Sequence, residues 1–212
     1  MFDVGETLVD ETRAWGSWAD WLGVPRLTLF AILGGVVERG EDHRRAFEIA
    51  RPGIDLRAEI DRQRAVGREY RLRPEDLYPD AVPALRSLAA AGYRIGVAAN
   101  QPVTTEQMLE AVDVPLELIA SSDRWGVAKP EPGFFARVAS ELGLEPGAIA
   151  YVGDRVDNDI RPAAAAGMLP IHVRRGPWGF AHADAAEAAG AMATIDSLAE
   201  VEEVLARLSV AG

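Results

Sequence analysis

From residue 80 onward, short apolar runs alternate with stretches of helical periodicity. The runs are uninterrupted and rich in Ile and Val, as expected for strands that are buried on both faces. They cover residues 94–99, 116–120, 148–152 and 169–173. Between them, one helix is expected to stop near Gly92, and another to run from Pro132 to Leu142 and end at Gly143. This alternation predicts an α/β fold with a doubly wound parallel sheet that helices cover on both faces.

Two of the expected helices carry capping signals at their starts. Asp80 can cap the helix that stops near Gly92, and Thr104 with Gln107 has the spacing of a capping box. Both would satisfy backbone N–H groups that have no partner inside a helix.

Residues 13–79 differ from the rest, because their patterns are helical throughout and no strand run interrupts them. The predicted organisation is therefore a core of residues 1–12 and 80–212 with an inserted helical domain of residues 13–79. Trp15, Trp18 and Trp21 recur every three residues. A helix face that packs on its neighbours is the favoured interpretation of this spacing, and a substrate-binding wall is the alternative.

The composition limits the possible partners and chemistry. The 212 residues contain 22 Lys and Arg against 33 Asp and Glu, and the net charge of −11 opposes binding to nucleic acid or to an anionic membrane surface. The absence of cysteine excludes disulfides, thiolate nucleophiles and sulfur-ligated metals. No long apolar segment or signal peptide is apparent, so we expect a cytoplasmic protein that acts on a small substrate, with its oligomeric state left open.

Several apolar runs end at a polar side chain. Asp3 follows Met1 and Phe2, Asn100 follows the run at 94–99, and Asp154 comes soon after the run at 148–152. Ligands of open parallel sheets bind beyond the carboxyl ends of the strands, so these side chains are expected to share one crevice. Lys129, a short loop after the run at 116–120, is available to join them.

Asp154 and Asp159 flank a tight turn. Two carboxylates that face each other across a turn repel unless a cation lies between them, and ligands that are all oxygen select a hard ion, Mg²⁺ before Ca²⁺ or Mn²⁺. Taken alone, the pattern fits a solvated helix start, capped by Asp157 or Asn158, equally well. Asp3 at a neighbouring strand end favours the metal site.

Two further segments, the N-terminus and residues 172–180, each allow two interpretations. Only Met1 and Phe2 precede Asp3, whereas a strand usually has about 5 residues, so the first strand is either abbreviated or begins upstream of Met1. Residues 172–180, "HVRRGPWGF", are interpreted as a surface turn, with a loop at the mouth of the site as the alternative.

Together these residues give the chain a resemblance to the haloacid dehalogenase superfamily of hydrolases, in the branch with a helical cap inserted after the first strand. The resemblance covers nearly the whole chain. Its motifs are Asp3 to Leu8, Ala99 with Asn100, Lys129 before a proline, and Gly153 to Asp159. The last two motifs are close matches, and the first two depart from the family pattern. The resemblance implies a Rossmann-like core and a helical cap domain.

The resemblance also implies roles for individual residues. Asp3 would be the nucleophile that forms an aspartyl intermediate, and Lys129 would balance its charge. Asp154, Asp159, one oxygen of Asp3 and the backbone carbonyl of Gly5 would hold Mg²⁺. The phosphoryl group of a small phosphorylated metabolite would be bound near Glu6, Thr7 and Asn100.

The two departures affect the expected chemistry. Gly5 stands where family phosphatases usually carry a second aspartate, the general acid and base, and Ala99 stands where they have Ser or Thr. Loss of a general acid and base costs about 10²- to 10⁴-fold in rate, which favours substrates with good leaving groups. The alternatives are a carbon–halogen hydrolase of the haloacid dehalogenase type, which also lacks the second aspartate, and a degenerate protein that binds a phosphorylated ligand.

Overall fold

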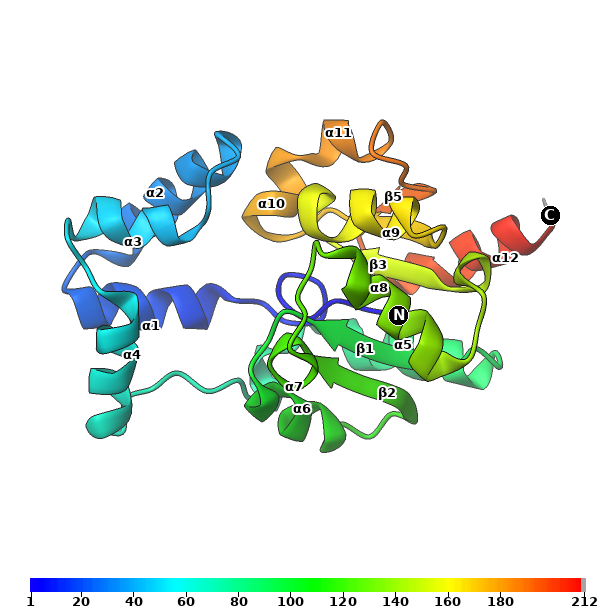
Figure 1. Ribbon diagram of the computed structural model, residues 1–212, viewed down its shortest axis with the longest axis horizontal. Helices are drawn as coiled ribbons and strands as arrows, with labels where there is room; N and C mark the ends of the chain where they lie inside the picture. The colour runs from blue at the N-terminus through cyan, green and yellow to red at the C-terminus, as the bar shows by residue number, and fades with distance from the viewer. Residues whose placement is uncertain (211–212) are drawn as a thin grey trace. The chain divides into compact units, whose positions relative to one another are not determined.

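The computed structural model describes residues 1–210. The chain forms two compact units (Figure 1). The first joins residues 1–10 to the chain from Arg73 onward, and the second is Glu11–Leu72. The first unit thus includes residues 73–79, which the sequence analysis assigned to the helical domain. Leu77 of this segment pairs with Val9 in an antiparallel bridge.

The first unit is an α/β unit built on parallel strands. These are β1 (Ile95–Ala99), β2 (Leu116–Ser121), β3 (Ala150–Gly153), β4 (Leu169–Val173) and β5 (Ala193–Ile195). β1 pairs with β2, and β4 pairs with both β3 and β5, all in parallel. The four predicted runs are confirmed to within two residues at each end, and β5 was not predicted.

The N-terminal segment lies between β1 and β3 and joins the two groups of strands. Phe2 forms parallel bridges to Val97 and to Val152. Its backbone N–H donates to Gly96 at 2.9 Å, and the Asp3 N–H donates to the Val152 carbonyl at 2.9 Å. Asp3 is therefore fixed between the ends of β1 and β3, where the sequence placed it.

Helices pack around these strands (Figure 1). They are α5 (Ala81–Ala90), α6 (Val103–Glu110), α7 (Ser122–Trp125), α8 (Pro132–Leu142), α9 (Arg161–Ala165), α10 (Gly176–Ala181), α11 (Ala183–Ala186) and α12 (Val201–Val210). The expected end of α8 at Gly143 is confirmed, because this glycine has the left-handed φ of 61°.

The two expected caps are wrong. Asp80 precedes α5 but makes no side-chain cap, because its Oδ2 instead accepts hydrogen bonds from Ser197 Oγ and from the Leu198 N–H. Thr104 lies inside the first turn of α6, because the helix begins at Val103 after the extended residue Pro102, two residues before the start that a cap at Thr104 would give.

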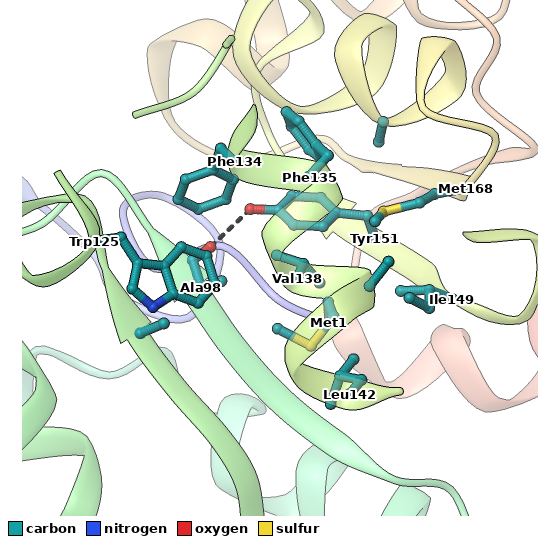
Figure 2. Close-up of a cluster of buried hydrophobic side chains, with 13 residues drawn as sticks. Met1, Ala98, Trp125, Phe134, Phe135, Val138, Leu142, Ile149, Tyr151 and Met168 are labelled. Carbon is teal, nitrogen blue, oxygen red and sulfur yellow. Dashed lines mark hydrogen bonds between the residues drawn. The ribbon is translucent and has the colours of Figure 1, made fainter. Parts of the chain in front are cut away.

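A cluster of apolar side chains behind β1 and β3 supports the strand ends (Figure 2). Phe134 and Phe135 of α8 meet edge to face, and Phe135 meets Tyr151 of β3 in the same way, with ring centroids 5.3 Å apart. The buried Tyr151 hydroxyl donates to the Ala98 carbonyl of β1 at 2.7 Å. These contacts tie β3 to β1 just below the residues that follow each strand.

The second unit contains α1 (Thr12–Leu22), α2 (Arg26–Glu38), α3 (Arg44–Ala50) and α4 (Leu56–Ala65). Trp15 stacks on Phe47 with ring centroids 5.2 Å apart, and Trp18 packs on the same ring at 4.8 Å. Trp21 donates its indole N–H to Glu59 at 3.0 Å. The tryptophan repeat therefore packs the helices together, the favoured interpretation of its spacing. Among residues 1–210, no single helix is long and apolar enough to cross a membrane, whereas the bent pair of α1 and α2 passes by length and composition.

Candidate functional site

Three buried carboxylates meet beyond the strand ends of the α/β unit. Asp3 follows the N-terminal segment, Asp154 follows β3, and Asp159 lies in the π-helical turn Val156–Ile160. Each offers an oxygen, and these oxygens all lie within 4.8 Å of one another. The structure thus brings together the three acids that the sequence analysis selected.

Lys129 stands between two of these acids. Its Nζ lies 2.5 Å from Asp3 Oδ1 and 2.5 Å from Asp159 Oδ1, and its side chain is only 2% exposed. Burial opposes the charge of the ammonium, but Asp159 and Asp3 outweigh this effect and hold the pKa of Lys129 well above its usual range. One ammonium among three carboxylates leaves the site with excess negative charge.

Asp154 carries the part of this charge that is not compensated. It is 1% exposed, and neither of its carboxylate oxygens has a hydrogen-bond partner among the described residues. Burial, followed by the charges of Asp159, Asp3 and Glu6, raises its pKa well above the ordinary value. A buried carboxylate without a partner is costly, and a bound cation removes that cost. The all-oxygen set fits a hard divalent ion such as Mg²⁺.

Local backbone features hold Asp159 in place. The Arg155 N–H donates to its Oδ2 at 3.0 Å. A Cβ at Gly153 would lie 2.4 Å from Asp159 Cγ, so the end of β3 requires glycine there. Asp157 of the same turn points elsewhere, because its carboxylate binds the Arg155 guanidinium at 3.0 and 2.6 Å and its side chain is half exposed.

The loop after Asp3 is a tight turn closed by its own backbone. The Val4 carbonyl accepts hydrogen bonds from the N–H groups of Leu8 and Val9 at 2.9 Å each. The Glu6 N–H donates to the Val9 carbonyl at 2.8 Å within the turn, and the predicted contact of Glu6 with a phosphoryl group stays a prediction. The Thr7 hydroxyl is fully buried, and its oxygen has no hydrogen-bond partner among the described residues.

Asn100 holds the loop of Lys129. Its Nδ2 donates to the Lys129 carbonyl, and its Oδ1 accepts from the Lys129 N–H, both at 2.8 Å. The side-chain amide thus fixes the backbone of the lysine. Its predicted contact with the phosphoryl group stays a prediction.

Sequence reasoning missed two residues of this region, both in the segment interpreted as a surface turn. That interpretation is wrong, because His172 is fully buried and Arg175 is 8% exposed. The Nε2 of His172 lies 3.0 Å from the Asp154 carbonyl, and Arg175 donates to the Thr7 carbonyl at 2.9 Å. The sequence shows two adjacent arginines followed by glycine and tryptophan, but it does not show which distant residues His172 and Arg175 contact.

A separate cavity of about 450 Å³ lies at the opposite end of the strands, and residues that line it include Met1, Ile95 and Leu142. None of the three clustered carboxylates lines it, so the chemistry is assigned to the carboxylate cluster and not to this cavity.

Two proteins of known sequence are similar to this chain over part of their length. A glyceraldehyde 3-phosphate phosphatase from Methanopyrus kandleri is 32% identical over 153 residues, which are 68% of this chain and 64% of that protein. A phosphoglycolate phosphatase from Rhodospirillum rubrum is 31% identical over 132 residues, 61% of this chain and 53% of that protein. The chain thus spans less than two thirds of these curated relatives.

Solved structures share the fold across almost the whole chain. A conserved haloacid dehalogenase-like protein of unknown function from Agrobacterium tumefaciens has a TM-score of 0.71 at 23% identity, with 98% of this chain and 97% of that chain covered. A haloacid dehalogenase-like hydrolase from Bacteroides fragilis, described as putative, has a TM-score of 0.69 at 21% identity, covering 94% and 97% of the two chains. The family model of haloacid dehalogenase-like hydrolases matches residues 1–167. The chain therefore belongs to the haloacid dehalogenase-like hydrolase family.

Proposed function

We propose that this protein is a Mg²⁺-dependent phosphatase that acts on a small phosphorylated metabolite through an aspartyl-phosphate intermediate at Asp3. The observation that carries the proposal is the contact of Lys129 with Asp3 and Asp159 beside the uncompensated carboxylate of Asp154. The names of the two relatives, a glyceraldehyde 3-phosphate phosphatase and a phosphoglycolate phosphatase, support the same reaction class.

The residues present fit Mg²⁺. Asp3, Asp154 and Asp159, with the backbone carbonyl of Gly5, would hold the ion, which when bound neutralises charge on the phosphoryl oxygens. Lys129 adds a second positive charge at the nucleophile itself. Phosphoryl transfer depends mainly on positioning and charge neutralisation, and this site is built from charged groups on rigid strand ends.

The proposed reaction has two steps. An oxygen of Asp3 attacks phosphorus, the new oxygen–phosphorus bond forms, and the bond to the leaving oxygen breaks. Water then attacks the phosphorus of the aspartyl phosphate, which releases inorganic phosphate and regenerates Asp3. Lys129, whose Nζ lies 2.5 Å from Asp3 Oδ1, orients this carboxylate and balances its charge.

Gly5 sets the leaving-group requirement. It offers no side chain to protonate the departing oxygen, so the leaving group must depart as an anion or take its proton from water. We expect aryl, acyl or anomeric phosphates to be hydrolysed faster than simple alkyl phosphates, by up to about 10²- to 10⁴-fold. Equal turnover of the two classes would contradict this requirement.

The decisive experiment measures phenol release from phenyl phosphate with Mg²⁺, with EDTA, and with the variants Asp3→Asn and Asp159→Asn. We expect turnover that needs both Mg²⁺ and the two aspartates. Asp157→Asn is the matched control, because this acid lies in the same turn but its half-exposed carboxylate binds Arg155. Turnover that survives in Asp3→Asn would refute the assignment of the nucleophile.

A carbon–halogen hydrolase is the second candidate, favoured by one observation, the side chain missing at Gly5. The buried acids Asp154 and Asp159 oppose it, because a site for a haloacid must accept the substrate's own carboxylate. Halide release from a 2-haloacid without release of phosphate from any phosphoester would select this candidate.

A further inference from the structure

The segment that follows β4 contacts the loop of the proposed nucleophile. Arg175 is nearly buried, and its Nη1 donates to the Thr7 carbonyl at 2.9 Å. Its Nη2 forms a short hydrogen bond to Asp80 Oδ2. Asp80 is in turn held by Ser197 Oγ at 2.7 Å, so the guanidinium is anchored to the scaffold on one side and to the loop on the other.

A second path leads from Arg175 to the same loop. Its guanidinium lies 4.4 Å from the ring centroid of Tyr78, and the Tyr78 hydroxyl donates to Glu6 Oε2 at 2.6 Å. Burial, followed by the hydrogen bond to Glu6, raises the pKa of Tyr78, so the hydroxyl keeps the proton that it donates. One arginine therefore holds two consecutive residues of the loop, Thr7 by a direct hydrogen bond and Glu6 through Tyr78.

The loop conformation depends on these contacts. Glu6 has a φ of 51°, the one positive value for a non-glycine residue among the described residues, and such a conformation persists only where its surroundings impose it. A Cβ at Gly176, the residue after Arg175, would lie 2.4 Å from Glu6 Cγ. The chain thus provides both a hydrogen bond and space for the Glu6 side chain.

We propose that Arg175 is a positioning residue, which fixes the loop from Asp3 to Thr7 by holding the Thr7 carbonyl directly and the Glu6 carboxylate through Tyr78. This role rests on the proposed function, because the loop carries the nucleophile and the Gly5 carbonyl assigned to Mg²⁺. Residues that do not contact the metal but hydrogen-bond its ligands change metal affinity or activity by about 10- to 100-fold when they are replaced.

The test measures Mg²⁺ affinity by titration calorimetry on the full chain, together with the melting temperature in EDTA. Arg175→Met is compared with Arg174→Met, because the neighbouring Arg174 makes a similar two-bond contact to Asp196 at the exposed surface. We expect Arg175→Met to weaken Mg²⁺ binding by about 10- to 100-fold and Arg174→Met to leave it unchanged. Tyr78→Phe, which removes only the hydroxyl, should weaken it in the same direction by less.

An Arg175→Met variant that is folded by circular dichroism and binds Mg²⁺ as tightly as Arg174→Met would overturn the proposal, even if its melting temperature is lower. If Arg175→Met does not fold, Tyr78→Phe decides, and unchanged Mg²⁺ affinity in that variant overturns it. Phenyl phosphate turnover is measured on the same preparations. A wild-type chain without turnover, but with the expected order of Mg²⁺ affinities, would reject the proposed function and support the role of Arg175.

Discussion

Replacement of Asp154 by asparagine should stabilise the metal-free protein and at the same time abolish its response to Mg²⁺. Both oxygens of this carboxylate are buried and have no hydrogen-bond partner among the described residues. At neutral pH the metal-free protein must either keep this charge out of water or bind a proton at Asp154, and each alternative lowers the free energy of unfolding. Asparagine has nearly the same shape and carries no charge.

The magnitude follows from the difference between two costs. An ionised carboxylate that is buried without a partner costs several kcal/mol, whereas a neutral amide in the same position costs about 1–3 kcal/mol for its unsatisfied groups. The difference corresponds to a gain of about 1–3 kcal/mol in the free energy of unfolding of Asp154→Asn in EDTA. For a chain of 150–250 residues this raises the melting temperature by about 2–12 °C.

Differential scanning calorimetry at neutral pH, in EDTA and in excess Mg²⁺, measures both effects. The melting temperature of wild type should rise on addition of Mg²⁺, because the ion binds only the folded state. Asp154→Asn should have a higher melting temperature than wild type in EDTA, and Mg²⁺ should not raise it further. Asp157→Asn is the control, since its half-exposed carboxylate binds Arg155. A lower melting temperature of Asp154→Asn in EDTA, or a normal gain with Mg²⁺, would refute the reasoning.

Three further predictions concern the same cluster. Burial raises the pKa of Asp159 from 3.8 to about 6, so the folded state binds this proton more tightly than the unfolded state. In EDTA, the contribution of Asp159 to the free energy of unfolding should therefore fall by about 3 kcal/mol as the pH rises from about 3 to about 7, and urea titrations in which wild type does not lose stability relative to Asp159→Asn over this range would contradict this. Lys129→Met removes the single ammonium of the cluster and should lower the free energy of unfolding in EDTA by about 3–5 kcal/mol, measured in the same way. Gly153→Ala should abolish Mg²⁺ binding by displacing Asp159, whereas Gly147→Ala, whose Cβ would meet only a carbonyl oxygen at 3.9 Å, should keep it; calorimetry distinguishes them.

The residues that sequence reasoning found are those whose position follows from a rule about strand ends. Asp3 and Asp154 each follow a segment of the sheet, so their proximity could be predicted from topology alone. Asp159 was found because it flanks a turn with Asp154, and Lys129 because it follows a strand by a short loop, and the structure places both beside Asp3. β5 was missed because three residues, Ala193–Ile195, give no detectable alternation.

The contacts that sequence reasoning missed are side-chain pairs distant along the chain. Arg175 and Thr7 are 168 residues apart in sequence, and neither lies in a periodic pattern that indicates the other. Asn100 illustrates a different difficulty. Its type and its place at a strand end suggested a ligand contact, which stays a prediction, but gave no sign that its amide also binds the Lys129 backbone as donor and acceptor.

The uncompensated carboxylate of Asp154 bears on whether the site has decayed. The chain lacks side chains for proton transfer at Gly5 and for phosphoryl contact at Ala99, as a degenerate binding protein could. Such a protein would gain stability from a neutral residue at 154, because a buried charge without a partner lowers the free energy of unfolding. Yet Asp154 is present, together with Gly153, whose missing Cβ makes room for Asp159. A carboxylate that destabilises the metal-free protein, beside a second carboxylate for which Gly153 makes room, is the arrangement expected of the proposed cation site, and this favours a working hydrolase over a decayed one.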